Sequence, residues 1–186
     1  VLAAVLFVVD LSVGAVPIPI REVLAALTGS GNDPVTTKII LNIRLLKAVV
    51  ALLAGAALAV SGLQMQTLFR NPLAGPSVLG ISSGASLGVA CVVLLSGAMG
   101  GVALSRLGYM GEVALSVAAI IGALAVMALI VYVSQKVKGN VTLLIIGVMI
   151  GYVASAVIGV LKYFSVEEDI RAYVIWGLGS FARVSG

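Results

Sequence analysis

Residues 55–88 read GAALAVSGLQMQTLFRNPLAGPSVLGISSGASLG. Two uncharged runs rich in small residues flank a short polar turn, Arg70–Pro76, which contains Asn71, Pro72 and Pro76. A soluble core does not need so much uncharged, glycine-rich sequence on both sides of one turn. The stretch therefore predicts two membrane helices that are joined at a water interface.

The composition of the whole chain agrees with this interpretation. Its 186 residues are 61% hydrophobic and only 10% charged, with a mean hydropathy of +1.24. Soluble domains carry about a quarter charged residues, so the composition indicates an integral membrane protein. We expect an all-α, polytopic transmembrane helix bundle over residues 1–186, with no separate soluble domain. Because Val1 opens the chain inside an apolar run, we interpret the sequence as part of a longer protein.

The apolar runs predict about five spans and two short helices that do not span, the first interfacial and the second interfacial or re-entrant. The spans are expected at residues 1–20, 48–69, 77–105, 113–135 and 141–161, the third of these runs being long enough to include a loop from Ser96. Pro17 and Pro19 are predicted to end the first helix, and Pro76 to begin the third. The short helices are expected at residues 21–27 and 172–182, the second one after an acidic group at Glu167–Asp169.

Small residues recur at intervals of four along the predicted spans. Such spacing lets helix backbones approach closely in a bilayer, where lipid supplies no hydrophobic force between helices. The glycines that we expect to pack helices are Gly55, Gly62, Gly80, Gly84, Gly88, Gly147, Gly151 and Gly159.

Polar side chains inside the spans have two interpretations each. Asp10 is either a polar position in the bundle or pathway, or a residue near an interface. Gln64 and Gln66 either form hydrogen bonds between helices or line a water-filled path. Lys38, Arg44 and Lys47 either mark the membrane edge or dock an acidic partner.

The sequence excludes several chemistries. It has no histidine and no GxxxxGK[ST] motif, so neither a serine–histidine–aspartate triad nor ATP binding by a P-loop is possible in this chain. Cys91 lies in an apolar run and is interpreted as a packing residue rather than a reactive thiol. Glu167–Asp169 could bind a cation, but a charged helix start is the favoured interpretation. We expect no catalytic residue, metal, cofactor or nucleic-acid partner.

The centre of the chain resembles the permease subunits of bacterial ABC importers for iron-siderophore, haem and vitamin B12. The resemblance rests on Gly55–Gly62, Met65–Gln66, Leu68–Ala74, Pro76, Leu79–Gly80 and Ser83–Ala85. In outline it extends from about residue 41 to 181, including Trp176–Gly177 and Gly179–Phe181.

The resemblance implies a permease of about ten spans, of which this chain would be the first half with about five. It also implies a homodimer in the bacterial cytoplasmic (inner) membrane, two separate ATPase subunits and an external substrate-binding protein. The segment that couples to the ATPases would lie outside this chain, so the chain alone is not expected to couple to ATP. Two rivals remain: a secondary transporter or channel, and a membrane scaffold that transports nothing.

One family motif, Arg-Leu-Pro-Arg at the external start of the second span, corresponds here to Arg44-Leu45-Leu46-Lys47. Through it, Arg44 and Lys47 are implied to dock the binding protein, although lysine lacks the bidentate fork of arginine. The resemblance places Arg70–Pro76 in the cytoplasm and residues 21–47 outside. The charges suggest the reverse, because eight of the 11 basic residues would then be external. We follow the resemblance, since an acidic partner gives a reason for outward basic residues.

Overall fold

The computed structural model describes residues 2–14, 16–31, 33–98 and 109–180. Every regular element in these residues is helical, which confirms the all-α prediction. The chain divides into two compact units, residues 1–59 with 180–186, and residues 60–179. The boundary lies within one long helix, and each unit is described by itself.

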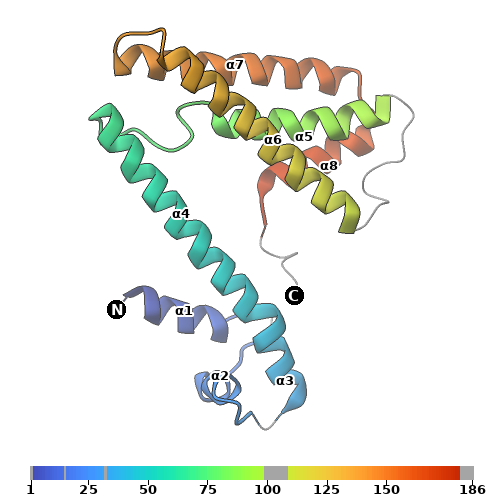
Figure 1. The fold of residues 1–186 in the computed structure, drawn as a ribbon. Coiled ribbons are helices and arrows are strands. Elements are labelled where there is room, and N and C mark those ends of the chain that lie inside the picture. The colour runs from blue at the N-terminus through green and yellow to red at the C-terminus, as the bar shows by residue number, and fades with distance from the viewer. Residues whose placement is uncertain (1, 15, 32, 99–108, 181–186) are drawn as a thin grey trace. The chain divides into compact units, whose positions relative to one another are not determined.

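The N-terminal unit holds α1 (Leu2–Ser12), α2 (Ile20–Leu27) and a long helix that starts at Pro34. This helix consists of α3 (Pro34–Ile39), a π-helical turn η1 (Ile40–Arg44) and α4 (Leu45–Phe69). Figure 1 shows α3 and α4 as one continuous rod. The core of the unit comprises Leu11, Ile18, Val23, Ala26, Ile40 and Ala48.

Asp33 begins the long helix in a regular way. Its carboxylate accepts hydrogen bonds from the backbone N–H groups of Val35 and Thr36, at 3.1 and 3.2 Å, and from the Thr36 hydroxyl. These donors have no partner within the helix, so an N-cap aspartate stabilises the helix start. Pro34 occupies the first helical position, where its missing N–H costs nothing.

The second unit is a bundle of α5 (Ile81–Ala98), α6 (Tyr109–Ser134), α7 (Asn140–Tyr163) and the short α8 (Glu167–Leu178). Helix α5 contacts each of the other three. Figure 1 shows α6 crossing α5 obliquely while α7 runs alongside α5. One apolar core lies between α5, α7 and α8, around Val89, Ala90, Val93, Leu94 and Ile158.

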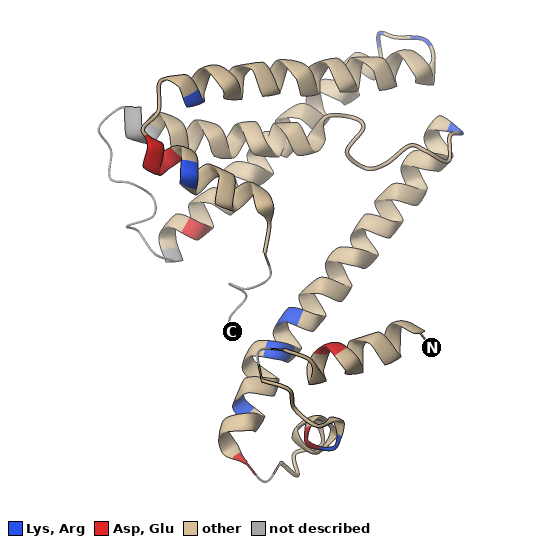
Figure 2. Cartoon of the chain, turned by 180° about the vertical axis from the view of Figure 1, so that it is seen from behind, with Lys and Arg blue, Asp and Glu red and all other residues tan. Residues whose placement is uncertain are grey.

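Three described helices are long and apolar enough to cross a membrane: Pro34–Phe69, Met110–Ser134 and Asn140–Tyr163. Helices Leu2–Ser12 and Ile81–Leu95 are apolar but shorter. The predicted spans at 48–69, 113–135 and 141–161 thus have matching helices, whereas a count of five is not established. Figure 2 shows that charged residues lie toward the ends of α4, α6 and α7, which suits long helices in a bilayer.

Four predicted boundaries are wrong. The first helix ends at Ser12, before either proline, so α1 covers only 11 residues, about 16 Å. The helix that contains the second predicted span begins at Pro34 rather than near residue 48. The last short helix begins at Glu167, so the acidic group forms its first turn, and it ends at Leu178. The predicted loop from Ser96 begins later, because α5 continues to Ala98; residues 99–101 of that loop lie outside the described residues.

A fifth wrong boundary concerns Pro76, which was predicted to begin the third helix. Residues 75–80 form turns instead of helix, with the N–H of Val78 bonded to Gly75 O and that of Gly80 to Ser77 O. Helix α5 then begins at Ile81. Gly80 makes this possible because its φ is +74°, a conformation that glycine adopts without steric cost.

Candidate functional site

Glycines bring α5 and α6 into backbone contact. A Cβ atom built on Gly84 would lie 2.6 Å from Gly122 O, and one built on Gly88 would overlap Ala118 O. Gly122 faces Gly84 in the same way from α6. No side chain larger than hydrogen fits at this crossing unless the helices separate.

A second close approach joins the turn before α5, at Leu79 and Gly80, to α7. A Cβ atom on Gly147 would lie 2.7 Å from the Cα atom of Leu79, and one on Gly80 would lie 2.7 Å from Gly147 O. Gly151 is less tight, with Ser83 Oγ at 3.3 Å from the same built position. Five of the eight glycines that we expected to pack helices therefore lie at close contacts of α5 or of the turn before it, namely Gly80, Gly84, Gly88, Gly147 and Gly151.

The other three glycines do not meet a neighbouring helix within the described residues. Gly55 and Gly159 have nothing within 4 Å of a built Cβ atom, and Gly62 has only the Pro76 side chain at 4.0 Å. Their packing role stays a prediction.

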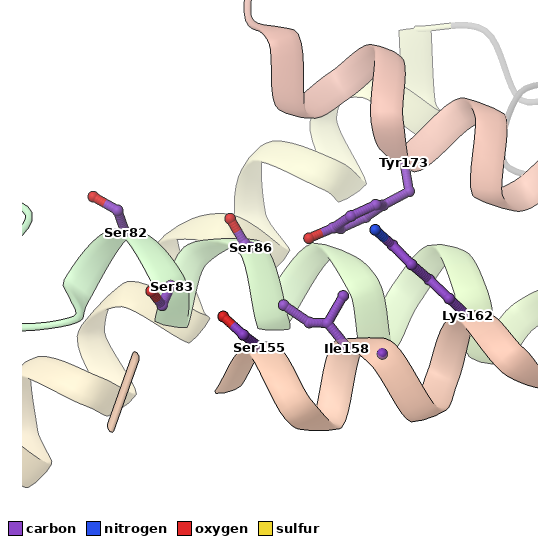
Figure 3. A pocket seen from close by; sticks show the side chains of 8 residues that line it. Ser82, Ser83, Ser86, Ser155, Ile158, Lys162 and Tyr173 are labelled. Atoms are coloured by element: carbon purple, nitrogen blue, oxygen red, sulfur yellow. The ribbon is translucent and has the colours of Figure 1, made fainter. Parts of the chain in front are cut away.

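Between α5, α7 and α8 lies a polar cavity of about 360 Å³. Figure 3 shows hydroxyl groups on α5 and α7 around it, together with Lys162 of α7 and Tyr173 of α8. The residues that line it are Ser82, Ser83, Ser86, Ser155, Ile158, Gly159, Lys162 and Tyr173. We call this the serine cavity.

The serine cavity has hydrogen-bonding groups but no catalytic set. Its only charged lining residue is Lys162, whose ammonium lies 4.8 Å from the centre of the Tyr173 ring, a cation–π contact. Ser155 donates its hydroxyl proton to Gly151 O at 2.9 Å. None of the eight lining residues is a carboxylate, histidine or cysteine, so no lining group is suited to activate a serine nucleophile. The cavity can offer hydroxyl groups and one positive charge to a polar ligand or to water.

The sequence analysis did not predict the serine cavity, because it considered only charged and amide side chains as polar positions within the spans. A signal was present: Ser82 and Ser86 are four residues apart, as are Ser155 and Gly159, so each pair lies on one helical face. The sequence could not reveal that these two faces meet.

The polar turn predicted at Arg70–Pro76 is confirmed as a break between α4 and α5. Asn71 Oδ1 accepts a hydrogen bond from the Leu73 N–H at 2.9 Å, while Phe69 and Ala74 are buried. Asn140, at the start of α7, donates its side-chain amide to Leu68 O at 2.6 Å. Gln64 and Gln66 are exposed in this unit, so the structure brings neither of them into the serine cavity.

In the N-terminal unit, Asp10 is exposed and Arg44 and Lys47 are half-buried. The Arg44 guanidinium is directed at the end of α1, where Nη1 donates to Leu11 O at 2.9 Å and to Ser12 O at 3.0 Å. Asp10 does not join either of these basic residues in an ion pair within the described chain. The docking role of Arg44 and Lys47 is untested by this geometry and stays a prediction.

Asp169 is an unusual acid in the bundle. It is 5% exposed, and its Oδ2 atom is buried without a hydrogen-bond partner. Burial raises the pKa of the Asp169 carboxyl, and the neighbouring Glu168 carboxylate raises it further. No described group of three or more acidic or cysteine side chains could hold a metal ion.

The long apolar helices and the glycine crossings suit a multi-pass membrane protein. A model of the FecCD transport family matches residues 2–185. The chain belongs to the FecCD transport family.

Curated relatives of the chain are permeases. It is 35% identical over 184 residues to the hemin transport system permease protein of Yersinia pestis, covering 98% of this chain and 52% of the relative. It is 36% identical over 156 residues to the vitamin B12 import system permease protein of Escherichia coli, covering 84% of this chain and 45% of the relative. The chain therefore spans about half the length of the curated relatives it matches.

A solved structure is also similar. It is described as an inward-facing conformation of a metal-chelate type ABC transporter, and it matches with a TM-score of 0.77 and 29% identity. The match covers 99% of this chain and 52% of the solved one.

Proposed function

We propose that this chain is the N-terminal half of the membrane-spanning permease of an ATP-driven importer. Its substrate would be an iron-siderophore, haem or a cobalamin. The observation that carries the proposal is the family match over residues 2–185, together with relatives that are permeases of haem and vitamin B12 systems. The importer would work in the bacterial cytoplasmic (inner) membrane.

The proposed mechanism is alternating access at the interface of two permease copies. Two separate ATPase subunits would drive it, and an external binding protein would deliver the substrate. The family match supports a transport role, and the hydroxyl groups of the serine cavity would be suited to bind a polar ligand or water. The rigid contacts at Gly84 and Gly88 favour movement of α5 and α6 as one body.

The test is uptake by the complete permease with its ATPase, reconstituted in proteoliposomes. We expect uptake of radiolabelled haem, ferric siderophore or cobalamin only with ATP and the binding protein together. Uptake that survives inactivation of every ATPase subunit would instead support a secondary transporter, for which Asp10 is the only acid inside a predicted span. No uptake under any condition, with the complex assembled, would support a scaffold.

Two pairs of substitutions separate a pathway role from packing. Gln64→Leu with Gln66→Leu removes the exposed amides of α4, and Ser86→Val with Ser155→Val fills the serine cavity. If a pair lines the pathway, uptake falls while assembly is intact. Unchanged uptake assigns that pair to packing.

The proposed orientation has its own test. In a Cys91→Ser background, Lys47→Cys should react with a membrane-impermeant maleimide added from outside the cell. Reaction from the cytoplasmic side alone would reverse the orientation and agree with the distribution of basic residues.

A further inference from the structure

The Arg44 side chain donates hydrogen bonds to the backbone carbonyl groups at the C-terminal end of α1. Its Nη1 atom donates to Leu11 O at 2.9 Å and Ser12 O at 3.0 Å, and Nη2 donates to Val16 O. One guanidinium thus joins three carbonyl groups that lie 28 to 33 residues earlier in the chain. The planar fork of arginine can make several such bonds at once, and lysine cannot.

The carbonyl groups at the end of α1 take their hydrogen-bond donors from outside the helix, and besides Arg44 the Ile18 N–H bonds to Ser12 O at 3.0 Å. The last carbonyls of a helix have no partner within it, and the last turn of α1 carries no basic residue of its own. The Ser12 hydroxyl is already bonded to Val9 O at 2.8 Å. Leu11 is fully buried, so the corner is shielded from water on that side, whereas Val13 and Val16 are exposed. A cation at a helix C-terminus is also favoured by the helix dipole.

The chain leaves space for the guanidinium at Gly14. A Cβ atom built there would lie 3.0 Å from Nη2 of Arg44 and 3.2 Å from its Cζ atom. A larger residue at position 14 would have to displace the arginine head.

We propose that Arg44, the last residue of η1, is a positioning residue that fixes the corner between α1, the following loop and the long helix. It acts on docking only through the shape of that corner. Lys47 makes no hydrogen bond or ion pair within the described chain, so its ammonium is the one of the pair that is available to an acidic partner. This second part rests on the proposed function, whereas the positioning role does not.

The experiment measures two quantities separately in the complete permease: the accessibility of the corner and the binding of the external binding protein. The reporter is Ile18→Cys in a Cys91→Ser background, because Ile18 is 7% exposed and its N–H bonds to Ser12 O at 3.0 Å. We expect Arg44→Gln to raise the alkylation rate of the reporter about tenfold, with a smaller rise for Arg44→Lys, because the corner opens locally. The midpoint of thermal unfolding in detergent should fall in the same order.

Lys47→Gln is the matched control. It removes the neighbouring charge and should change neither the alkylation rate nor the midpoint, while it weakens binding of the binding protein. Gly14→Val should reproduce the Arg44→Gln effect, and the two together should be no worse than either alone, because both break one contact.

The positioning role is overturned if Arg44→Gln weakens partner binding while reporter and midpoint stay as in the parent protein. If the parent protein binds no external partner at all, the proposed function fails. The alkylation rate of Ile18→Cys would then still show whether Arg44 has the positioning role, because that rate does not depend on a partner.

Discussion

In the N-terminal unit, α1 and the long helix are joined by a flexible side chain that carries a charge, whereas in the bundle α5 and α6 meet through bare backbone. Arg44 reaches three carbonyl groups across the first contact. Gly84 and Gly88 leave nothing but hydrogen at the second. The first contact can adjust when a neighbour changes, because an arginine has rotatable bonds. The second can only separate.

The two regions also treat their acids differently. Asp33 is exposed, and its carboxylate accepts hydrogen bonds at a helix start. Asp169 is buried with one oxygen atom unpartnered. An ionised aspartate therefore stabilises the N-terminal unit at Asp33, whereas an ionised aspartate destabilises the bundle at Asp169. Substitutions in each region can test both contrasts.

The largest effect is expected from one methyl group at the helix crossing. In Gly88→Ala the Cβ atom would overlap the carbonyl oxygen of Ala118, a backbone atom that cannot move alone. We expect a loss of about 3 kcal/mol in the free energy of unfolding, or failure to assemble, since overpacking is costly where nothing can yield. Thermal unfolding of the permease in detergent measures it.

Gly14→Ala is the matched comparison, because its added methyl meets the movable head of Arg44 at 3.0 Å. Its cost should be below about 1 kcal/mol. Gly55→Ala, with nothing within 4 Å of the built Cβ atom, should cost no more. Equal losses at positions 14 and 88 would remove the distinction between a flexible and a rigid contact.

The next largest effect is a stabilisation, and it is expected from a substitution at Asp169. Burial, with help from Glu168, raises the pKa of Asp169 in the folded protein above its ordinary value of 3.8. Ionisation is therefore harder in the folded state, so stability falls as the pH rises through the raised pKa. Asp169→Asn removes the charge and should stabilise the bundle by about 1 kcal/mol at pH 7.

The advantage of Asp169→Asn should shrink as the pH falls, and it should vanish near the pKa of the unfolded state, at about pH 4. Thermal midpoints recorded from pH 4 to pH 8 would show this. The control is Glu167→Gln, which removes an exposed acid from the same helical turn. If Asp169→Asn is destabilising at every pH, the carboxylate has a favourable partner in the folded protein.

Much of the fold could be predicted from hydropathy and glycine spacing. The runs at 113–135 and 141–161 have matching helices because long apolar stretches must satisfy their backbone internally. The interval of four between Gly80, Gly84 and Gly88 predicted a close seam, and the structure brings each of them against α6 or α7. Such periodicity identifies one face of a helix, but it does not name the partner helix.

The polar contacts could not be predicted in this way. The spacing of Arg44 and Lys47 suggested a shared face, but it carried no information about carbonyl groups 28 to 33 residues earlier. The burial of Asp169 was equally hidden, because an acidic run at a helix start usually lies in water. The serine cavity depends on which faces of α5 and α7 meet, and this is a property of tertiary packing.

The smallest effect is expected at the exposed cap. The Thr36 hydroxyl and the N–H groups of Val35 and Thr36 lower the pKa of Asp33 from its ordinary value of 3.8. Its carboxylate thus stabilises the helix start at neutral pH, and this contribution is lost as the pH falls through the lowered pKa, below about 4. Asp33→Ala should increase hydrogen exchange at Val35 and Thr36 severalfold at pH 7 without affecting α6 or α7. Asp33→Asn keeps a cap that does not titrate, so its protection should stay constant where that of the parent protein declines in acid. If the parent protein and Asp33→Ala show the same protection at neutral pH, the cap contributes nothing. The start of the long helix would then depend on the packing of Ile40 and its neighbours alone.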